Sequence, residues 1–344
     1  MIALPGKAML KASALVTLAM TAALVVHQLS YANDFALPNQ SIELVRFCNA
    51  SERYGKDHIH PTEASTPQEP IPKIIHQIWK TNDTSTYPGS GERIQASYET
   101  WKHSMEPLNY TIKLWTDEDV LELIKTEYSW LLSTYEGYAQ NIQRADVARL
   151  VVVHAEGGIY ADLDVYPRST EVMSCMQSLG LQAVFAPTSN TLGLSNHFFM
   201  AQRGSSFLEW ALQEAKRRGG ATSKRILLPY LQVFWSTGPI MVTYAFHQYA
   251  WMYSTLHHGV ALLDEGYARK LFGHAAGRSW HGSDGQFLNY VSDHLGTVLF
   301  WVTVCLSVLS LATIIVLKKS RGKSIDFLVG CGSVCRKKSW VTKV

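Results

Sequence analysis

Charged residues are scarce in this chain. Asp, Glu, Lys and Arg make up only 17% of its 344 residues, and the formal net charge is +3. No block of basic residues is interleaved with aromatic residues, so the sequence does not predict a surface that binds nucleic acid. Cysteine is scarce too: the chain has five, and none is spaced with histidine in the manner of a zinc site. No internal repeat is visible, which argues against a repeat array.

Apolar residues reach 47%, and the excess lies at the two ends of the chain. Near the N-terminus, Ala12–Val26 is an uncharged run, shorter than the roughly 20 residues of a full membrane span. Two interpretations remain open: an uncleaved signal anchor, or a signal peptide cleaved near the small residues Ser30 and Ala32. Residues 27–29 make a poor cleavage region, which favours the anchor. Either way, the segment directs the chain into the secretory pathway.

A second uncharged run, Gly296–Leu317, is about 22 residues long, enough to span a bilayer with some tilt. A buried core helix of this length without a charge is the less favoured alternative. Basic residues follow at once: Lys318, Lys319, Arg321 and Lys323. The positive-inside rule places them in the cytosol, and Lys7 and Lys11 place the N-terminus there as well. We therefore expect both termini in the cytosol and the domain between them in the lumen of the Golgi or the endoplasmic reticulum.

Acceptor sequences for N-glycosylation agree with a lumenal domain, and they lie at Asn39, Asn49, Asn82 and Asn109. Cys48 and Cys175 are the cysteines expected in the lumen, and the sequence leaves open whether they pair. Cys305 lies in the second apolar run. Cys331 and Cys335 follow on the cytosolic side, where thiols stay reduced and either remain unmodified or carry a palmitoyl group.

The middle of the chain alternates between strand and helix patterns. Apolar or alternating runs predict strands at residues 73–79, 110–115, 183–186 and 197–201. Helical patterns lie at 117–125, with Thr116 as N-cap, at 145–156 and at 207–218. This alternation predicts an α/β sheet, in which ligands bind beyond the carboxyl ends of the strands. Residues 32–69 are polar and loop-rich, as in a stem between membrane and domain.

A pair of aspartates follows one of these strands. The helical stretch that begins at Arg144 ends at Gly157-Gly158. The apolar run after it is followed by Asp162 and Asp164. Residues i and i+2 of a strand point to the same side, so we expect the two carboxylates to project together. Such hard oxygen ligands suit Mg²⁺ or Mn²⁺ held with a diphosphate. An Asp-x-Asp triplet alone is also typical of a solvated turn, but Gly-Gly-Ile-Tyr-Ala before it and Val-Tyr-Pro after it favour a site.

Asp146 and Arg149 are three residues apart and therefore share one face of the preceding helix. An ordinary surface ion pair is the simplest interpretation of such a pair. The rest of this helix is apolar, however, which predicts that it is buried. Charges on a buried helix need partners or a functional role, so this pair is a candidate part of the site.

The stretch Arg144–Pro167 closely resembles the fungal glycosyltransferases with an Asp-x-Asp sugar-binding region, glycosyltransferase family 32. The family includes the mannosyltransferase that initiates Golgi outer chains and the inositol phosphoceramide mannosyltransferases. Ile71–Thr81 resembles the first strand of the family, and Ser279–Ser283 resembles its closing Trp-His block. The resemblance covers roughly Pro70 to Ser283. It implies a GT-A type fold, a nucleotide-sugar donor and a divalent metal.

With this resemblance, the chain divides into five expected parts. They are an N-terminal signal anchor (1–31), a lumenal stem (32–69), a GT-A glycosyltransferase domain (70–295), a transmembrane helix (296–317) and a cytosolic tail (318–344).

The resemblance implies roles for the charged residues. Asp164 is expected to be the main metal ligand, and Asp162 to contact the metal or the ribose of the donor. Asp146 and Arg149 match family positions that contact the donor sugar or its phosphate. Tyr160 lies on the same expected strand side as the aspartates, where it either lines the donor site or packs as an ordinary tyrosine.

Three further segments match family positions near the donor. Ile78 and Trp79 end the first strand, where Trp79 is expected to stack on the nucleobase, whereas His76 is expected to be a packed strand histidine. His281, in a glycine-flanked loop, is expected to reach the metal or the diphosphate; the alternative is a surface-loop histidine. Ser236–Pro239 also resembles a family loop near the site, without an assigned role.

The family resemblance implies retention at the anomeric carbon. Double displacement needs an enzyme carboxylate as nucleophile, and none is assigned besides the metal ligands, so front-face departure fits better. The sphingolipid enzymes of the family resemble this chain in having a span after the catalytic domain. This resemblance favours transfer of mannose from GDP-mannose to inositol phosphoceramide in sphingolipid synthesis, with a small regulatory membrane subunit as a candidate partner. The alternatives are a Golgi N-glycan mannosyltransferase, a glycolipid galactosyltransferase of the same fold, and a catalytically silent membrane partner of another transferase.

Overall fold

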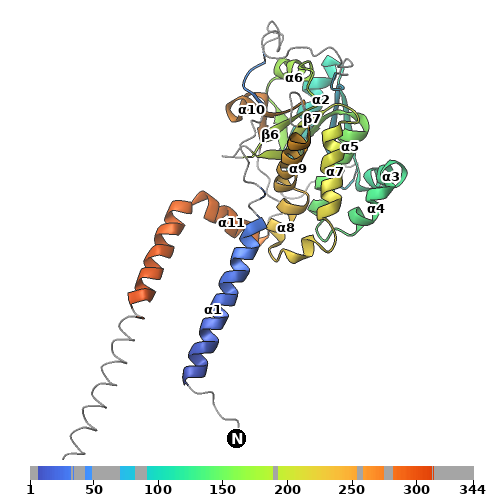
Figure 1. Cartoon of the computed structure of the whole chain (residues 1–344). Helices are drawn as coiled ribbons and strands as arrows, with labels where there is room; N and C mark the ends of the chain where they lie inside the picture. Colours follow the sequence, from blue (N-terminus) through green and yellow to red (C-terminus); the bar gives the residue numbers. More distant parts are fainter. Residues whose placement is uncertain are drawn as a thin grey trace, which may run out of the picture. The chain divides into compact units, whose positions relative to one another are not determined.

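The computed structural model describes residues 7–31, 34, 43–48, 70–81, 91–188, 193–253, 259–274, 282–311 and 313. The chain divides into two compact units, Met1–Gly282 and Ser283–Val344. The first unit contains the mixed α/β sheet and the sheet's helices (Figure 1). The predicted acceptor sequences at Asn39, Asn49 and Asn82 lie outside the described residues, as do Trp280 and His281 of the Trp-His block.

A seven-stranded sheet forms the centre of the first unit, in the order β1-β8-β6-β7-β4-β2-β3. Its strands are β1 (Glu43–Val45), β2 (Ile74–Ile78), β3 (Thr111–Trp115), β4 (Gly158–Ala161), β6 (Ala183–Pro187), β7 (Leu194–Ala201) and β8 (Val260–Leu263). Only β7 runs antiparallel to its neighbours. A two-stranded antiparallel sheet pairs β5 (Val165–Pro167) with β9 (Phe272–His274). The predicted α/β sheet is therefore confirmed.

Helices cover both faces of this sheet. One hydrophobic core contains residues of α3 (Asp117–Glu127), α4 (Ser129–Glu136), α5 (Asn141–Glu156), α7 (Ser206–Arg218) and α9 (Pro239–Met252). The other contains residues of α2 (Gly91–Met105), α6 (Thr170–Gln177) and α10 (Glu265–Leu271). The short elements η3 (Glu106–Leu108), η4 (Ser223–Arg225) and α8 (Pro229–Ser236) complete the unit. The result is a three-layer α/β/α arrangement.

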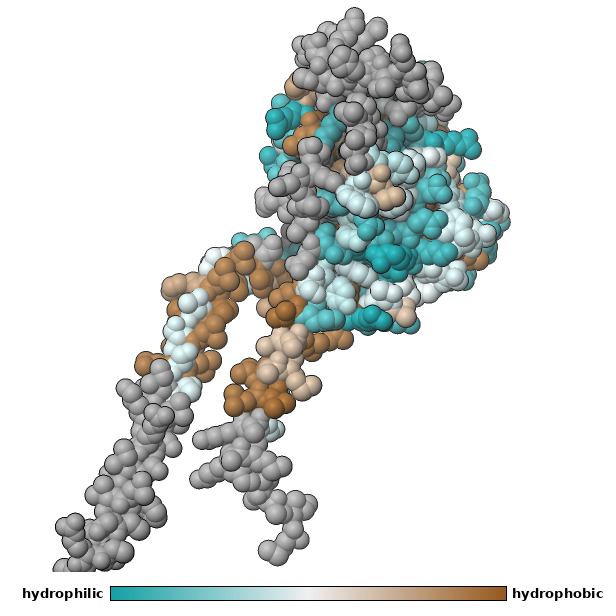
Figure 2. All heavy atoms as spheres, in the orientation of Figure 1, coloured by the Kyte–Doolittle hydropathy of each residue, from teal (hydrophilic) through white to brown (hydrophobic). Residues whose placement is uncertain are grey.

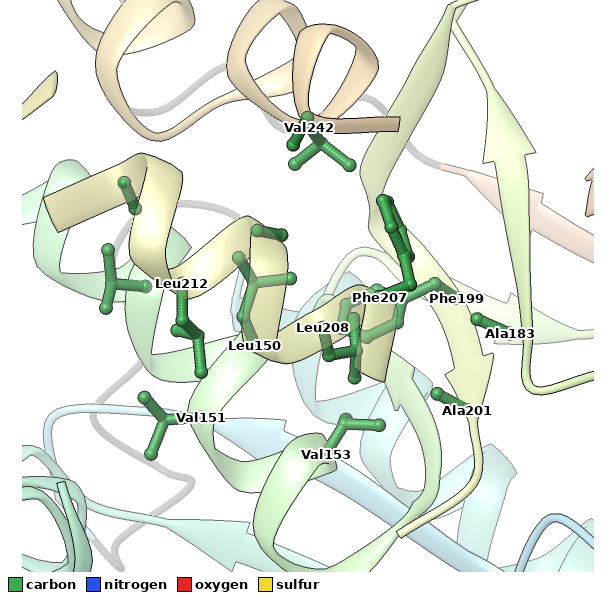
Figure 3. Packing of buried hydrophobic residues seen from close by; sticks show 14 of the residues in the cluster. Leu150, Val151, Val153, Ala183, Phe199, Ala201, Phe207, Leu208, Leu212 and Val242 are labelled. Carbon is green, nitrogen blue, oxygen red and sulfur yellow. The ribbon is translucent and has the colours of Figure 1, made fainter. Parts of the chain in front are cut away.

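The first core is built mainly on α5 and α7. Figure 3 shows Leu150 and Val153 of α5 facing Leu208 and Leu212 of α7, with Phe199 of β7 beside them. All five side chains are fully buried. Truncating one such leucine to alanine costs about 2–5 kcal/mol of stability. α5, which carries Asp146 and Arg149, is thus held rigidly between the sheet and α7.

Two glycines allow α5 to pass directly into β4. Gly157 has φ 68° and Gly158 has φ 109°, both in the region that favours glycine. A Cβ at Gly157 would lie 2.6 Å from the amide nitrogen of Arg203, and a Cβ at Gly158 would lie 2.5 Å from the carbonyl oxygen of Ile74. Neither position therefore has room for a side chain. The double glycine places β4 between β2 and β7, directly after the helix.

A short strand within the expected stem belongs to the sheet. β1 pairs in parallel with β8 at the edge of the sheet, from Glu43 opposite Ala261 to Val45 opposite Leu263. Cys48 forms a disulfide with Cys175, with 6.0 Å between their Cα atoms. The interpretation of residues 32–69 as a stem is therefore corrected for Glu43–Cys48. A strand of three residues is too short for its alternation to be recognised in the sequence.

Helix α1 (Lys7–Ser30) is the long apolar helix at the N-terminus. By length and composition alone, its stretch Ser13–Ser30 is sufficient to cross a membrane. Its side chains are apolar and mostly exposed, as the brown spheres along this helix show (Figures 1 and 2). An exposed apolar helix of this length is typical of a membrane segment or a signal sequence.

The second unit, described by itself, begins with α11 (Ser283–Asp293) and continues as a helix over Leu295–Leu311. These two helices reach the length and hydropathy of a membrane span only when taken together, and they are bent by 90° at the break. The expected transmembrane helix at 296–317 thus corresponds to a described helix as far as Leu311, with exposed apolar side chains such as Leu299 and Leu306.

Candidate active site

The candidate site begins with Asp146, which is buried on α5. Its Oδ1 accepts a hydrogen bond from Asn196 Nδ2 at 3.0 Å, and its Oδ2 accepts one from Thr237 Oγ1 at 2.9 Å. Arg149 Nη1 lies 3.3 Å from Oδ1. Burial raises the pKa of this carboxyl, and Arg149, Thr237 and Asn196 oppose the rise by stabilising the charged form. Segments from α5, β7 and the end of α8 therefore meet at one carboxylate.

Arg149 is one turn further along α5 and is also buried. Its Nη1 donates to the carbonyl oxygen of Asn196 at 3.2 Å, and its Nη2 lies 3.4 Å from Asp162 Oδ1. Its guanidinium carbon lies 5.2 Å from the centre of the Tyr160 ring. Burial opposes the charge, but the nearby carboxylates, Asp162 foremost, hold the pKa of Arg149 above its ordinary value. The expected face-sharing pair is thus a buried ion pair rather than a surface one.

One donor of Arg149 has no partner. Its Nε is buried and makes no hydrogen bond. A buried, unsatisfied nitrogen on a charged group is costly, so the surrounding residues do not fully satisfy this guanidinium. Nε is therefore the nitrogen of Arg149 that none of the described residues engages.

Asp162 and Asp164 lie on a turn, not on a strand. β4 ends at Ala161 and β5 begins at Val165. The amide of Val165 donates to the carbonyl oxygen of Asp162 at 2.9 Å, which closes the turn. The strand alternation expected from the sequence is therefore wrong at these positions, because the chain reverses between two short strands. The two carboxylates have different neighbours as a consequence.

Asp162 lies beside the buried pair Asp146 and Arg149, and its own side chain keeps 26% of its surface exposed. Tyr160 donates its hydroxyl to Asp162 Oδ1 at 2.8 Å, and the same oxygen lies 3.4 Å from Arg149. The backbone amide of Asp162 donates to the carbonyl oxygen of His197 at 2.9 Å. Burial raises the pKa of Asp162 to about 6; Asp164 adds to this rise and Arg149 opposes it. Tyr160 is thus part of the charged cluster, and its side chain also packs on Phe199.

Asp164 lies beside two histidines from other strands. Its Oδ2 is 3.3 Å from His274 Nε2, and the His274 ring stacks on the His197 ring with centroids 4.5 Å apart. β9 brings His274 there, because His274 pairs with Val165, the residue after Asp164. Burial and, to a lesser extent, His274 lower the pKa of His197 to about 3, although Asp164 opposes the shift, so His197 is neutral. The side chains of Asp164 and His274 are 18% and 38% exposed, so a ligand can reach them from solvent.

Ile78 and Trp79 lie at the carboxyl end of β2. This strand is parallel to β4 and adjacent to it, so their carboxyl ends meet at one edge of the sheet. Both side chains are partly exposed, and the backbone amide of Trp79 donates to the carbonyl oxygen of Trp115 at 2.9 Å. His76, in contrast, is fully buried and bonded on both ring nitrogens, to Gly157 and Trp115, as expected of a packed strand histidine.

Four residues of the site were not predicted from the sequence: Asn196, His197, Thr237 and His274. Thr237 lies in the Ser236–Pro239 segment, whose resemblance to a family loop was the one available signal. Asn196 and His197 are polar residues within an otherwise apolar strand, and their neighbours are set by the pairing of β7 with β4. The position of His274 in the site depends on the pairing of β9 with β5, and this pairing has no signature in the sequence around His274.

The donor set around the turn fits a divalent metal. Asp162 and Asp164 supply carboxylate oxygens, and the His274 imidazole adds a nitrogen ligand that Mn²⁺ accepts. Among the described residues no group of three His, Cys, Asp or Glu side chains is already arranged around a metal position. A metal bound here would therefore complete its shell with oxygens of a ligand and water, as Mg²⁺ usually does.

Comparison with known proteins gives a consistent result. Residues 91–185, which include the whole Asp146–Asp164 region, match the family model described as "Glycosyltransferase sugar-binding region containing DXD motif". Inositol phosphoceramide mannosyltransferase 1 of Schizosaccharomyces pombe is 30% identical over 271 residues, which cover 77% of this chain and 79% of that protein. Mannosyl phosphorylinositol ceramide synthase SUR1 of Saccharomyces cerevisiae is 29% identical over 252 residues, 70% of this chain but only 59% of that protein.

Among solved structures, the PaToxG glycosyltransferase is similar with a TM-score of 0.39 and 20% identity, over 53% of this chain and 70% of that one. A structural likeness this distant carries no functional argument, so the sequence relatives decide the assignment. The chain is a glycosyltransferase, and it belongs to the DXD-containing family that includes the inositol phosphoceramide mannosyltransferases.

Proposed function

We propose that this protein is a retaining, metal-dependent mannosyltransferase of GT-A type that transfers mannose from GDP-mannose to inositol phosphoceramide in sphingolipid synthesis. The observation that carries the proposal is the Asp162–Asp164 turn, which adjoins the incompletely satisfied Arg149. The relatives named as inositol phosphoceramide mannosyltransferases support the acceptor and the sugar.

Asp164 is the proposed main ligand of Mn²⁺ or Mg²⁺, with Asp162 and His274 beside it. His281 remains a candidate ligand, outside the described residues. A divalent metal bound here would supply positive charge that stabilises the departing nucleoside diphosphate. Tyr160 holds Asp162 in place through its hydroxyl, so the turn keeps its conformation before a ligand arrives.

Arg149 and Asp146 are the proposed contacts to the sugar or phosphate of the donor. Arg149 carries a permanent charge, and its Nε is free to donate to a donor oxygen. Asp146 is fixed by Asn196 and Thr237, so it positions Arg149. Trp79 is the proposed stacking partner of the nucleobase and Ile78 its apolar neighbour, since both lie at the same sheet edge.

Retention is proposed to proceed by front-face departure. Double displacement needs a carboxylate close to the anomeric carbon. The described carboxylates of the site are already engaged: Asp146 with three partners, Asp162 with Arg149 and Tyr160, and Asp164 with His274. The leaving phosphate is then the base that takes the proton of the acceptor hydroxyl.

We further propose a lumenal catalytic domain, in the Golgi or the endoplasmic reticulum, with both termini in the cytosol, anchored by α1 and by the helix at 296–317. The Cys48–Cys175 disulfide supports an oxidising compartment. Asn109, in its acceptor sequence, is exposed and so accessible to glycosylation. Glycosidase treatment of the protein should increase its mobility on a gel, and an unchanged band would contradict the lumenal placement.

The function is tested with membranes that contain the full-length protein. Labelled GDP-mannose is supplied with inositol phosphoceramide in one reaction and with a glycoprotein acceptor in another, and membranes with the Asp164→Ala variant serve as the control. We expect label in the lipid for the wild type only. Label in glycoprotein alone would favour a Golgi N-glycan mannosyltransferase, and label from UDP-galactose alone would favour a glycolipid galactosyltransferase. Absence of transfer with every donor would favour the remaining alternative, a catalytically silent membrane partner of another transferase.

A further inference from the structure

The end of helix α1 is joined to the catalytic domain. Gln28 is buried, whereas the neighbouring residues of α1 are exposed. Its side-chain nitrogen donates to the carbonyl oxygen of Arg225 at 3.2 Å, and its side-chain oxygen accepts from the amide of Leu227 at 2.8 Å. One amide side chain thus pairs with the backbone of the segment between α7 and α8. The C-terminal end of α1 therefore lies directly beside the segment between α7 and α8.

The residues after α1 extend this junction. Tyr31 packs edge-on against Trp235, with 5.3 Å between ring centroids. Asp34 Oδ2 accepts from Trp235 Nε1 at 2.9 Å and lies 2.9 Å from Arg218 Nη2. Arg218 is fully buried between the rings of Trp235 and Tyr244. A buried arginine needs such carboxylate partners, so the residues that follow α1 are part of the folded domain.

These contacts bear on the two interpretations of the N-terminal segment. Cleavage near Ser30 or Ala32 would remove Gln28 and Tyr31, and with them the hydrogen bonds to the segment and the packing on Trp235. A signal peptide that is discarded has no reason to be built into the domain. The junction therefore favours a retained anchor.

The segment joined to Gln28 presents basic and apolar side chains to solvent. Within Thr222–Pro229, Lys224, Arg225 and Leu227 are exposed, and Leu227 keeps 62% of its surface accessible. The apolar stretch of α1 ends at Ser30, two residues beyond Gln28. Where α1 spans a bilayer, its end marks the headgroup region, and the segment bonded to Gln28 lies at that depth. Basic side chains can pair with the phosphate groups of lipid headgroups while an apolar neighbour enters the membrane interface.

We infer that Thr222–Pro229, together with the end of α1, forms a membrane-docking face that lies on the bilayer surface, with Lys224 and Arg225 against acidic lipid headgroups and Leu227 entering the interface. The occupant of this face is the lipid surface itself. The inference rests on the anchor role of α1, which is part of the proposed function, but not on the transferase reaction.

The docking face is close to the candidate site. α8 begins at Pro229, the last residue of the face, and ends at Ser236, and its eight residues span about 12 Å. The next residue, Thr237, donates to Asp146 in the charged cluster. One short helix therefore connects the bilayer surface to the donor-binding residues.

The test uses the full-length protein reconstituted in phosphatidylcholine vesicles with and without phosphatidylinositol. A photoreactive benzoylphenylalanine replaces Leu227 in one sample and Lys125, an exposed residue of α3, in the matched control. After illumination, lipid adducts are identified by mass spectrometry. We expect adducts from position 227 and none from position 125. In the Lys224→Gln/Arg225→Gln background, the ratio of phosphatidylinositol to phosphatidylcholine adducts at 227 should fall about fivefold or more.

Absence of lipid adducts at position 227, or equal adducts at 227 and 125, would overturn the docking face. An unchanged lipid ratio in the double variant would overturn the role of the two basic residues. These readouts need no transferase activity, so they fail independently of the proposed reaction. A protein that docks as expected but transfers no mannose would contradict only the proposed function.

Discussion

Two buried arginines of this protein have similar surroundings but different degrees of satisfaction. Arg218 donates through Nε to Glu214 at 2.5 Å and through Nη1 to the carbonyl oxygen of Trp235 at 2.9 Å, and its Nη2 is 2.9 Å from Asp34. Arg149 has two carboxylates at 3.3 and 3.4 Å, and its Nε has no partner. Both guanidinium groups also lie over aromatic rings.

We propose that this difference separates a structural arginine, Arg218, from a functional one, Arg149. Each nitrogen of Arg218 has a partner, and these contacts hold α7, α8 and the residues after α1 together. Arg149 keeps an unused donor at the sheet edge where ligands of α/β folds bind. Burial alone therefore does not distinguish the two arginines, and the proposed role of Arg149 rests on its unpaired Nε together with its position beside Asp162. The following predictions test this distinction, from the largest expected effect to the smallest.

Asp164→Ala should lower the transfer rate most, by about 1000-fold or more, because electrostatic stabilisation of the departing group depends on the metal that Asp164 is proposed to hold. Its thermal unfolding temperature should stay close to that of the wild type, since the side chain lies on an accessible turn. Initial rates with Mn²⁺ and thermal melting are measured side by side. A near-wild-type rate would contradict the metal assignment, and EDTA should reproduce the loss in the wild type.

Arg149→Met and Arg218→Met form a matched pair. Arg149→Met should lower the transfer rate about 100- to 1000-fold with the smaller loss of stability, because Asp146 keeps its bonds from Asn196 and Thr237. Arg218→Met breaks a buried ion pair and should cost about 3–5 kcal/mol of stability, while the folded fraction keeps its activity. Rate and denaturant midpoint are measured for both variants. If Arg149→Met mainly lost stability and Arg218→Met mainly lost activity, Arg218 would be the functional arginine and Arg149 the structural one.

Deletion of residues 296–344 removes the second apolar run but neither arginine cluster. We expect activity on membrane-embedded inositol phosphoceramide to fall about tenfold or more, because tethering near the bilayer raises the effective concentration of the acceptor. Hydrolysis of GDP-mannose should persist. Full activity of the truncated protein on vesicles would remove the argument that the C-terminal run favours a lipid acceptor.

A third buried group, His76, has no carboxylate bonded to it and stays neutral instead. Burial lowers its pKa to about 4, although the hydrogen bond to Gly157 opposes the shift. Nδ1 accepts a hydrogen bond from Trp115 Nε1, in agreement with a neutral ring. The unfolded chain binds this proton near pH 6.5. The stability that neutral His76 contributes is therefore present above pH 6.5 and is lost as the pH falls towards 4, by at most about 3 kcal/mol.

This pH dependence is measured as the free energy of unfolding between pH 7 and pH 4 for the wild type and for His76→Gln. The variant should be less stable at pH 7 and should show a shallower decrease towards acid. An equal slope in both proteins would mean that other groups, and not His76, carry the pH dependence.

The sequence predicted those parts of the fold that have local signals. α5 ends at Gly157 as expected, and Thr116 caps α3 in a capping box with Asp119. The buried pairing of Asp146 with Arg149 followed from spacing and an apolar helix. The orientation of Asp162 and Asp164 was wrong, because a turn between two short strands has no distinct pattern within a run that reads as one strand.

The remaining residues of the site depend on contacts between distant segments. Asn196 reaches Asp146 across 50 residues of sequence and Thr237 across 91. His274 reaches Asp164 only because β9 pairs with β5. Such placements are set by strand order and packing, which a single sequence does not encode in any short window. The junction of α1 with Arg218 and Trp235 belongs to the same class.

The central claim, that the Asp162–Asp164 turn with Arg149 binds a metal-complexed nucleotide sugar, is tested most directly by calorimetric binding of GDP-mannose to the full-length protein. The account predicts binding to the wild type with Mn²⁺, little binding after EDTA, and loss of the Mn²⁺-dependent part in Asp164→Ala. Binding that is equally tight in wild type and Asp164→Ala, or that is indifferent to Mn²⁺, would contradict it.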